Sequence, residues 1–204
     1  METIEYLIIL LFSAIVHEVA HGLMAERFGD STARDEGRIT LNPIPHIDPF
    51  GSIFLPFLLI SLGSPVVLGA AKPVPVDFES LRPRKWGMIA VSLAGPLANV
   101  LLAVLCVIPI KLGVINDISG PILLRVIFMN LLLAVFNLIP IPPLDGSKIL
   151  ASILPERYMH HIFRLEQYGF ILVLLFVYSG LLSVFFYPVC QLFFNLAGIP
   201  IRCS

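Results

Sequence analysis

Four long apolar segments, separated by polar and charged stretches, dominate the pattern of this chain. They cover about residues 3–28, 86–110 and 118–139, and a last segment begins near 168 and continues past Pro188. Each is close to the roughly 20 apolar residues that an α-helix needs to cross a bilayer, so we expect about four transmembrane helices. Because proline interrupts helical hydrogen bonding, we expect Pro188 to divide the last segment into a span and a short terminal helix.

A fifth apolar stretch, residues 50–71, has a different character. Leu-Gly-Ser-Pro at 62–65 interrupts it, and basic residues flank it on both sides. The flanking residues are Arg27, Arg34 and Arg38 before it, and Lys72, Arg82, Arg84 and Lys85 after it. Because basic loops stay in the cytoplasm, both flanks belong on the same side of the membrane. The stretch is therefore predicted to be a re-entrant hairpin that lines a protein cavity.

The same charge rule orients the other segments. Lys148, Arg157 and Arg164 follow the 118–139 segment and mark its end as cytoplasmic. The ends of the first and third segments then lie near the same face of the membrane.

Composition agrees with a membrane protein. The chain has 204 residues, 57% of them hydrophobic and 13% charged, and its mean hydropathy is +0.93. A soluble domain carries about 25% charged residues. The formal net charge of −1 argues against a nucleic-acid partner, and the expected surroundings are membrane lipid. The three cysteines, Cys106, Cys190 and Cys203, lack metal-ligand spacing and are expected to be apolar packing residues rather than a disulfide.

The candidate chemistry lies within the first apolar segment, at His17-Glu18-Val19-Ala20-His21. Two histidines four residues apart project from one face of a helix and can hold one zinc ion. The intervening Glu18 can then act on a zinc-bound water. Ionisable groups inside a membrane helix are costly, and those that persist face a protein interior and serve a function.

Catalytic zinc takes three protein ligands, so a third must come from elsewhere in the chain. Asp145 is the best candidate, because three prolines stop the third segment and the chain then presents one carboxylate. Capping of a helix over 146–154 explains Asp145 equally well. His46 and Asp48 are weaker candidates, because a turn before proline explains both.

Taken together, these residues resemble the site-2 protease family, whose members are zinc metalloproteases that cleave substrates within the membrane. The resemblance covers roughly residues 10–150. Its motifs are His17-Glu18-x-x-His21, Ala94-Gly95-Pro96-Leu97-Ala98-Asn99, Asn137 with Leu144-Asp145-Gly146, Leu41-Asn42-Pro43 with His46-Ile47-Asp48-Pro49, and Ala71-Lys72-Pro73-Val74-Pro75-Val76.

The resemblance implies roles for individual residues. It makes His17, His21 and Asp145 the ligands of one zinc ion per chain, Glu18 the general base, and Asn137 a substrate-binding residue near the scissile peptide. It also implies a small membrane-embedded β-sheet, formed by residues near 37–45 and 66–76. The chain is similar to compact members without a PDZ or CBS domain.

Further residues of these motifs are expected to be structural. Gly95 and Asn99 are expected to allow close helix contact and an interhelical hydrogen bond, and the alternative for Asn137 is also a hydrogen bond between helices. His160 and His161 are expected at the surface.

The expected fold is an all-α polytopic membrane protein with the hairpin and the small sheet added. Residues 1–204 would form one integral-membrane domain, with core motifs at about 10–150 and C-terminal helices at about 166–200. The charge rule places the active site toward the cytoplasmic side, and we expect a prokaryotic plasma membrane.

The expected activity is that of an intramembrane zinc endopeptidase acting on transmembrane protein substrates. Two alternatives are a metal transporter and a membrane-anchored peptidase that takes soluble peptides. A transporter would show repeated halves and polar groups across the membrane depth, neither of which is visible in the sequence. Burial of the motif within a span disfavours the anchored peptidase.

Overall fold

The computed structural model describes residues 2–48, 54, 57, 58, 61, 72–117 and 119–203. The described part of the chain is helical. Its elements are α1 (Glu2–Arg27), α2 (Thr32–Asp35), η1 (Ile44–His46), α4 (Arg84–Lys111), α5 (Ser119–Asn137), α6 (Asp145–Ile153), α7 (Glu156–Leu165), η3 (Glu166–Tyr168), α8 (Gly169–Tyr178) and α9 (Leu181–Ala197).

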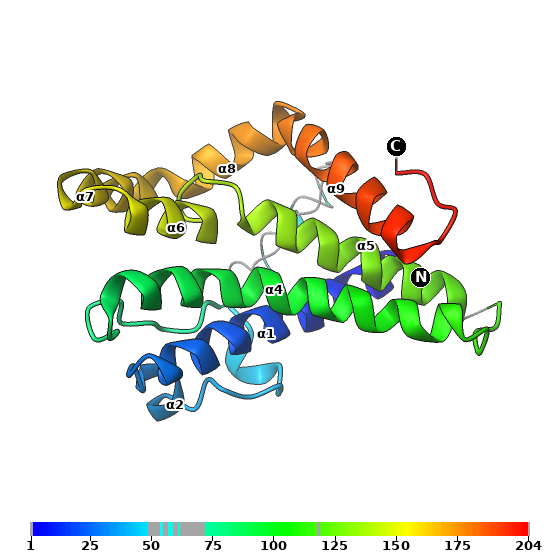
Figure 1. Ribbon diagram of the computed structural model, residues 1–204, viewed down its shortest axis with the longest axis horizontal. Helices are drawn as coiled ribbons and strands as arrows, with labels where there is room; N and C mark the ends of the chain where they lie inside the picture. Colours follow the sequence, from blue (N-terminus) through cyan, green and yellow to red (C-terminus); the bar gives the residue numbers. More distant parts are fainter. Residues whose placement is uncertain are drawn as a thin grey trace.

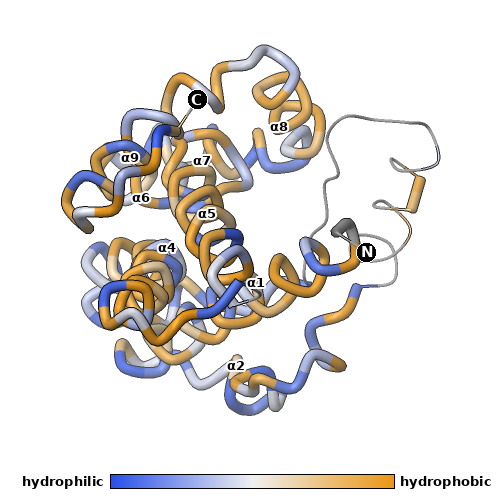
Figure 2. Tube along the Cα trace, turned by 90° about the vertical axis from the view of Figure 1, so that its right-hand side faces the viewer, coloured by the Kyte–Doolittle hydropathy of each residue, from blue (hydrophilic) through white to orange (hydrophobic). Residues whose placement is uncertain are grey.

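Helices α1, α4 and α5 pack against one another and form the centre of the molecule (Figure 1). Small and apolar side chains fill most of the space between them, including Ile15 of α1, Val91 of α4 and Leu131 of α5. Many large apolar side chains of these helices also point outward, such as Leu101 and Ile122. Figure 2 shows hydrophobic residues along most of α4 and α5. An apolar interior and an apolar exterior together suit a lipid environment.

Within the part of the chain that the structure describes, four helices are long and apolar enough to cross a membrane, in agreement with the predicted number. The first three, Ile4–Arg27, Arg84–Lys111 and Ser119–Asn137, match the predicted segments closely. The fourth, Arg157–Tyr178, begins earlier than predicted and runs through α7, η3 and α8.

The predicted break at Pro188 is wrong. Pro188 lies inside α9, and the chain turns at Gly180, which has φ +75. This left-handed conformation favours glycine, whereas a single proline removes only one backbone donor from a helix that neighbouring elements support.

The expectation for the cysteines was also wrong in part. Cys190 in α9 and Cys203 form a disulfide, and Cys106 is free. Gly198 ends α9 at φ +65 and turns the C-terminal tail back along the helix. The backbone N–H of Cys203 then donates to the side chain of Gln191. A pairing across 13 residues depends on this reversal, which cysteine spacing alone does not show.

No strand occurs among the described residues, so the predicted β-sheet is not supported there. The part of that prediction at 66–71, and nearly all of the predicted hairpin at 50–71, lie outside the described residues. The described parts, near 37–45 and at 72–76, contact each other without a strand ladder. Arg38 donates to the carbonyl oxygens of Lys72 and Pro73, and the N–H of Lys72 donates to the carbonyl of His46.

Candidate metal centre

His17 and His21 project from the same face of α1, near the end that leads to Arg27. Both side chains are buried, and their Nε2 atoms lie 3.0 Å apart. The i, i+4 spacing of a regular helix accounts for this convergence.

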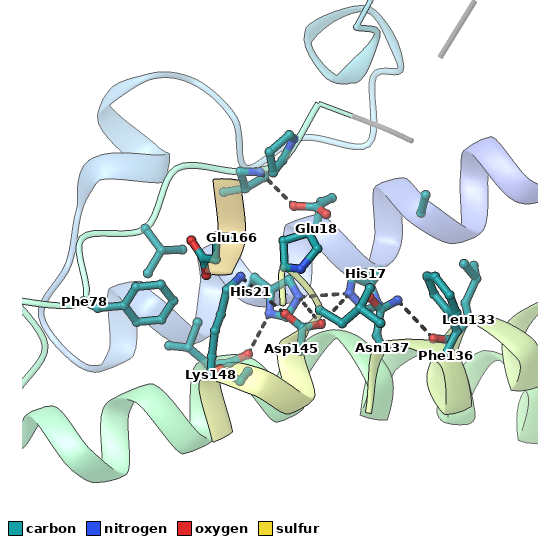
Figure 3. Close-up of a pocket in the computed structure, with 18 of the residues that line it drawn as sticks. His17, Glu18, His21, Phe78, Leu133, Phe136, Asn137, Asp145, Lys148 and Glu166 are labelled. Carbon is teal, nitrogen blue, oxygen red and sulfur yellow. Dashed lines mark hydrogen bonds and ion pairs between the residues drawn. The ribbon is translucent and has the colours of Figure 1, made fainter. Parts of the chain in front are cut away.

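Asp145 reaches the two histidines from the first turn of α6. Its Oδ2 lies 3.1 Å from Nε2 of His17 and 3.2 Å from Nε2 of His21. Gly146 permits this placement, because a Cβ there would lie 2.2 Å from the carbonyl oxygen of Leu138. The three predicted ligands, from segments far apart in sequence, therefore converge at one point (Figure 3).

The alternative that Asp145 caps a helix does not match the structure. Helix α6 begins at Asp145 itself, its N-cap is Leu144, and no side-chain hydrogen bond caps it. Burial alone would raise the pKa of Asp145, but its contacts with His17 and His21 and the charge of Lys148 hold that pKa below its usual range. The carboxylate thus faces the histidines as an anion.

The protons of the histidines point away from this convergence. Nδ1 of His21 lies 2.7 Å from the backbone carbonyl oxygen of Val91, which can only accept a hydrogen bond, so Nδ1–H donates and, in the neutral imidazole, Nε2 carries the lone pair. Nδ1 of His17 lies 2.6 Å from Oδ1 of Asn99. With both imidazoles neutral, two lone pairs and a carboxylate oxygen meet at one point. Such a set of groups can hold a metal ion.

The dimensions of this cluster suit zinc. Zinc held by bonds of about 2.0–2.1 Å in tetrahedral geometry has ligand atoms roughly 3.3 Å apart, close to the separations found here. Space for an ion is provided by Gly95 of α4. A Cβ at this position would lie 2.5 Å from Nε2 of both His17 and His21.

Glu18 lies beside the cluster and has a separate partner. Its Oε2 accepts a hydrogen bond of 2.7 Å from the backbone N–H of Val74, in the extended segment 72–76. Figure 3 shows Glu18 directed toward this segment, whereas His17, His21 and Asp145 point toward one another.

These groups line a cavity of about 680 Å³. Most of its wall is apolar and comes from α1, α5 and the 73–78 segment. The polar residues on the wall, apart from the three converging side chains, are Glu18, Ser92, Asn137, Lys148 and Glu166. A carboxylate, a triad of metal-ligand type and an apolar surface therefore share one space.

Asn137 is on the cavity wall but outside the cluster. It ends α5, and its Nδ2 donates to the carbonyl oxygen of Leu133 within the same helix. His46 is fully buried, its Nε2 lies 2.8 Å from the carbonyl oxygen of Thr40, and it does not join the converging ligands. Asp48 is not among those ligands either.

Sequence reasoning missed several residues of the site. Gly95 and Asn99 were expected only to join helices, yet Gly95 adjoins both histidines and Asn99 contacts one of them. The i, i+4 spacing of these two residues within α4 was the available signal. Nothing in the sequence indicated that Val74 would donate to Glu18.

Comparison with known proteins agrees with this chemistry. The sequence model described as "Peptidase family M50" matches residues 5–117 and 114–180. The chain is 36% identical over 201 residues to "Putative zinc metalloprotease YwhC" of Bacillus subtilis, covering 92% of this chain and 87% of that protein.

Two further relatives are more distant. Rip2 of Mycolicibacterium smegmatis, which has the same description, is 32% identical over 196 residues, covering 93% of this chain and 72% of that protein. "Zinc metalloprotease MJ0392" of Methanocaldococcus jannaschii is 28% identical over 153 residues, covering 74% of this chain and 35% of that protein. No solved structure matches the chain.

Proposed function

The chain belongs to peptidase family M50, the site-2 protease family of zinc metalloproteases, and we propose that it cleaves membrane-anchored proteins in or near their transmembrane segments. The observation that carries the proposal is the placement of the buried triad. Its two histidines lie within a membrane-length apolar helix and open onto a cavity with largely apolar walls. A substrate that reaches this cavity must itself be compatible with apolar surroundings.

In this proposal His17, His21 and Asp145 hold the zinc ion. Zinc in such a site supplies Lewis-acid chemistry, which polarises a carbonyl and lowers the pKa of water to about 7. The three ligands belong to α1 and α6. In α4, Gly95 lies against both histidines and Asn99 contacts Nδ1 of His17.

Glu18 would be the general base. Its carboxylate takes a proton from the attacking water and returns it to the leaving amine, so one group serves both halves of the hydrolysis. The hydrogen bond from Val74 holds one carboxylate oxygen and leaves the other, Oε1, for the proton.

Asn137 would bind the substrate. Its amide now donates within α5, but it lines the same cavity as Glu18 and can donate to a substrate carbonyl instead. A helical substrate hides its carbonyls in its own hydrogen bonds, so local unwinding must precede cleavage. Helix-breaking residues in the substrate should therefore promote its cleavage.

We further propose that the centre lies toward the cytoplasmic side. Arg27 and Arg84 flank the helix ends nearest to the triad, and Lys148 lies beside Asp145. Basic residues of this kind mark cytoplasmic ends of membrane helices.

The test is Glu18→Gln in the full chain, reconstituted in lipid vesicles with a single-span substrate. We expect this variant to retain zinc and lose cleavage, whereas Glu36→Gln, an exposed acidic residue near α2, should cleave normally. Continued cleavage by the Glu18 variant would exclude the mechanism. Faster cleavage of the same recognition sequence as a free soluble peptide would favour an anchored peptidase of the ordinary kind.

A further inference from the structure

A chain of buried polar side chains crosses the centre of the molecule and ends at His17. It starts at Asn130 in α5 and continues through Asn99 in α4; both side chains are 0% exposed. Ser13 in α1 contacts both asparagines. Because buried amides in a membrane interior are costly unless satisfied, the direction of each hydrogen bond is informative.

The orientation of the side-chain amide is fixed first at Asn130. Its Nδ2 lies 2.9 Å from the backbone carbonyl oxygen of Val126 and 3.0 Å from Oγ of Ser13. A carbonyl oxygen only accepts, so the amide nitrogen must face it. Oδ1 of Asn130 therefore faces the other way, toward Asn99.

The orientation of the Asn130 amide then determines that of the Asn99 amide. Its Nδ2 donates to Oδ1 of Asn130 at 2.8 Å and to the backbone carbonyl oxygen of Ser13 at 3.2 Å. Both hydrogens of the amide are then used, and only Oδ1 is left for His17. The histidine must therefore donate from Nδ1, at 2.6 Å, and its Nε2 carries the lone pair that faces Asp145 and His21.

We propose that Asn130 and Asn99 are positioning residues that set the tautomer of His17 and so prepare its Nε2 as a metal ligand. The inference rests on the zinc site proposed above. Neither asparagine touches the converging ligand atoms of the site; Asn99 acts through Nδ1 of His17, and Asn130 acts through Asn99.

The hydrogen-bonded chain Asn130–Asn99–His17 is called the relay below. The two histidines differ in a way that explains why only His17 needs it. His21 donates to a backbone carbonyl, that of Val91, which cannot be reversed. The partner of His17 is a side-chain amide, which presents a donor or an acceptor depending on its rotation. Asn130 removes this freedom, because its own amide is fixed by the carbonyl of Val126.

The first experiment measures zinc affinity of the full chain in detergent by competition with a chromophoric chelator. Asn99→Leu removes the acceptor and should raise the zinc Kd about 10–100-fold, the usual effect of losing an outer partner of a ligating histidine. Asn99→Asp loses both amide hydrogens but keeps an acceptor oxygen opposite Nδ1 of His17, so its zinc Kd should rise less than that of Asn99→Leu. Asn195→Leu makes the same change at an exposed position on α9 and should leave the Kd unchanged.

The second experiment reads the tautomer itself. In the chelator-treated full chain with ¹⁵N-labelled histidine, the ring nitrogens of His17 should show Nδ1–H in the wild type. Asn130→Leu leaves His17 and Asn99 intact but frees the amide of Asn99, so a measurable population with an unprotonated Nδ1 should appear. A purely structural role for Asn130 would not change this equilibrium.

The outcomes separate the two proposals. Wild-type protein that binds no zinc would overturn the proposed function itself. Zinc binding by the wild type with an unchanged Kd in Asn99→Leu, equal losses in Asn99→Leu and Asn99→Asp, or an unaltered tautomer in Asn130→Leu would overturn the relay and leave the zinc site standing.

Discussion

The backbone N–H of Val74 donates to the carboxylate of Glu18 at 2.7 Å, linking the extended 72–76 segment to the glutamate of the histidine motif. Pro73 and Pro75 have no N–H, so Val74 supplies the one backbone donor of residues 73–75. Arg38 holds the same segment by two of its carbonyl oxygens. The position of Glu18 thus depends on a segment more than fifty residues away in sequence.

Replacing Val74 with proline removes this donor. Hydrogen bonds to charged groups contribute about 1.5–3 kcal/mol, so we expect cleavage to slow roughly 10–100-fold. Zinc content should stay at one ion per chain, because Val74 is not one of the converging ligands. Kinetics with a single-span substrate and metal analysis together check this, and Val74→Ala, which keeps the N–H, is the control. Equal rates for the two variants would show that the hydrogen bond is not needed.

Gly95→Ala tests the space beside the histidines. An added methyl in a helix interior normally stabilises it by about 0.5–1 kcal/mol, but here the Cβ would lie 2.5 Å from both Nε2 atoms. We therefore expect zinc binding to be lost, as measured by metal analysis after purification. Gly120→Ala is the control, because its Cβ would meet no atom closer than 3.6 Å. Full zinc occupancy in Gly95→Ala would place the metal elsewhere.

Asp145→Ala distinguishes a ligand from a helix-capping residue. Removing a ligand should weaken zinc binding by more than the roughly 10–100-fold lost with an outer-shell partner. Because Asp145 makes no capping hydrogen bond, helix content measured by circular dichroism should stay unchanged. Asp117→Ala, at an exposed loop position, serves as the control. Stoichiometric zinc in the Asp145 variant would remove this residue from the ligand set.

Cys203→Ser opens the disulfide to Cys190. Closing a loop of 13 residues restricts the unfolded chain, so its loss should cost on the order of 3 kcal/mol and lower the thermal unfolding temperature. Thiol counting under denaturing, non-reducing conditions should find one thiol in the wild type, that of Cys106. Three thiols in the wild type would show that the pairing does not form.

The sequence was most informative where composition alone decides the outcome. Long, mostly apolar segments form helices in lipid, so α1, α4 and α5 follow from apolar length. The ligand pair His17 and His21 follows from helical spacing in the same way. Asp145 could be nominated but not assigned, because its position depends on how tightly the turn at Gly146 packs against Leu138.

Features that depend on local backbone conformation or on contacts between segments could not be predicted. The bend at Gly180 rather than Pro188 reflects backbone conformation and support from neighbouring helices. The Cys190–Cys203 pairing requires the reversal at Gly198. Asn130 belongs to no recognisable motif, and its importance emerges only from its contact with Asn99.

The two prolines on either side of Val74 also limit the backbone hydrogen bonds that this segment can donate. An extended chain with free N–H groups can pair with any other extended chain, which leads to aggregation or to retention of a cleaved product. Residues 73–75 have no free N–H for such pairing, because two are prolines and the third donates to Glu18. Under the proposed function, which requires an unwound substrate, this stretch would therefore not act as a template for the substrate.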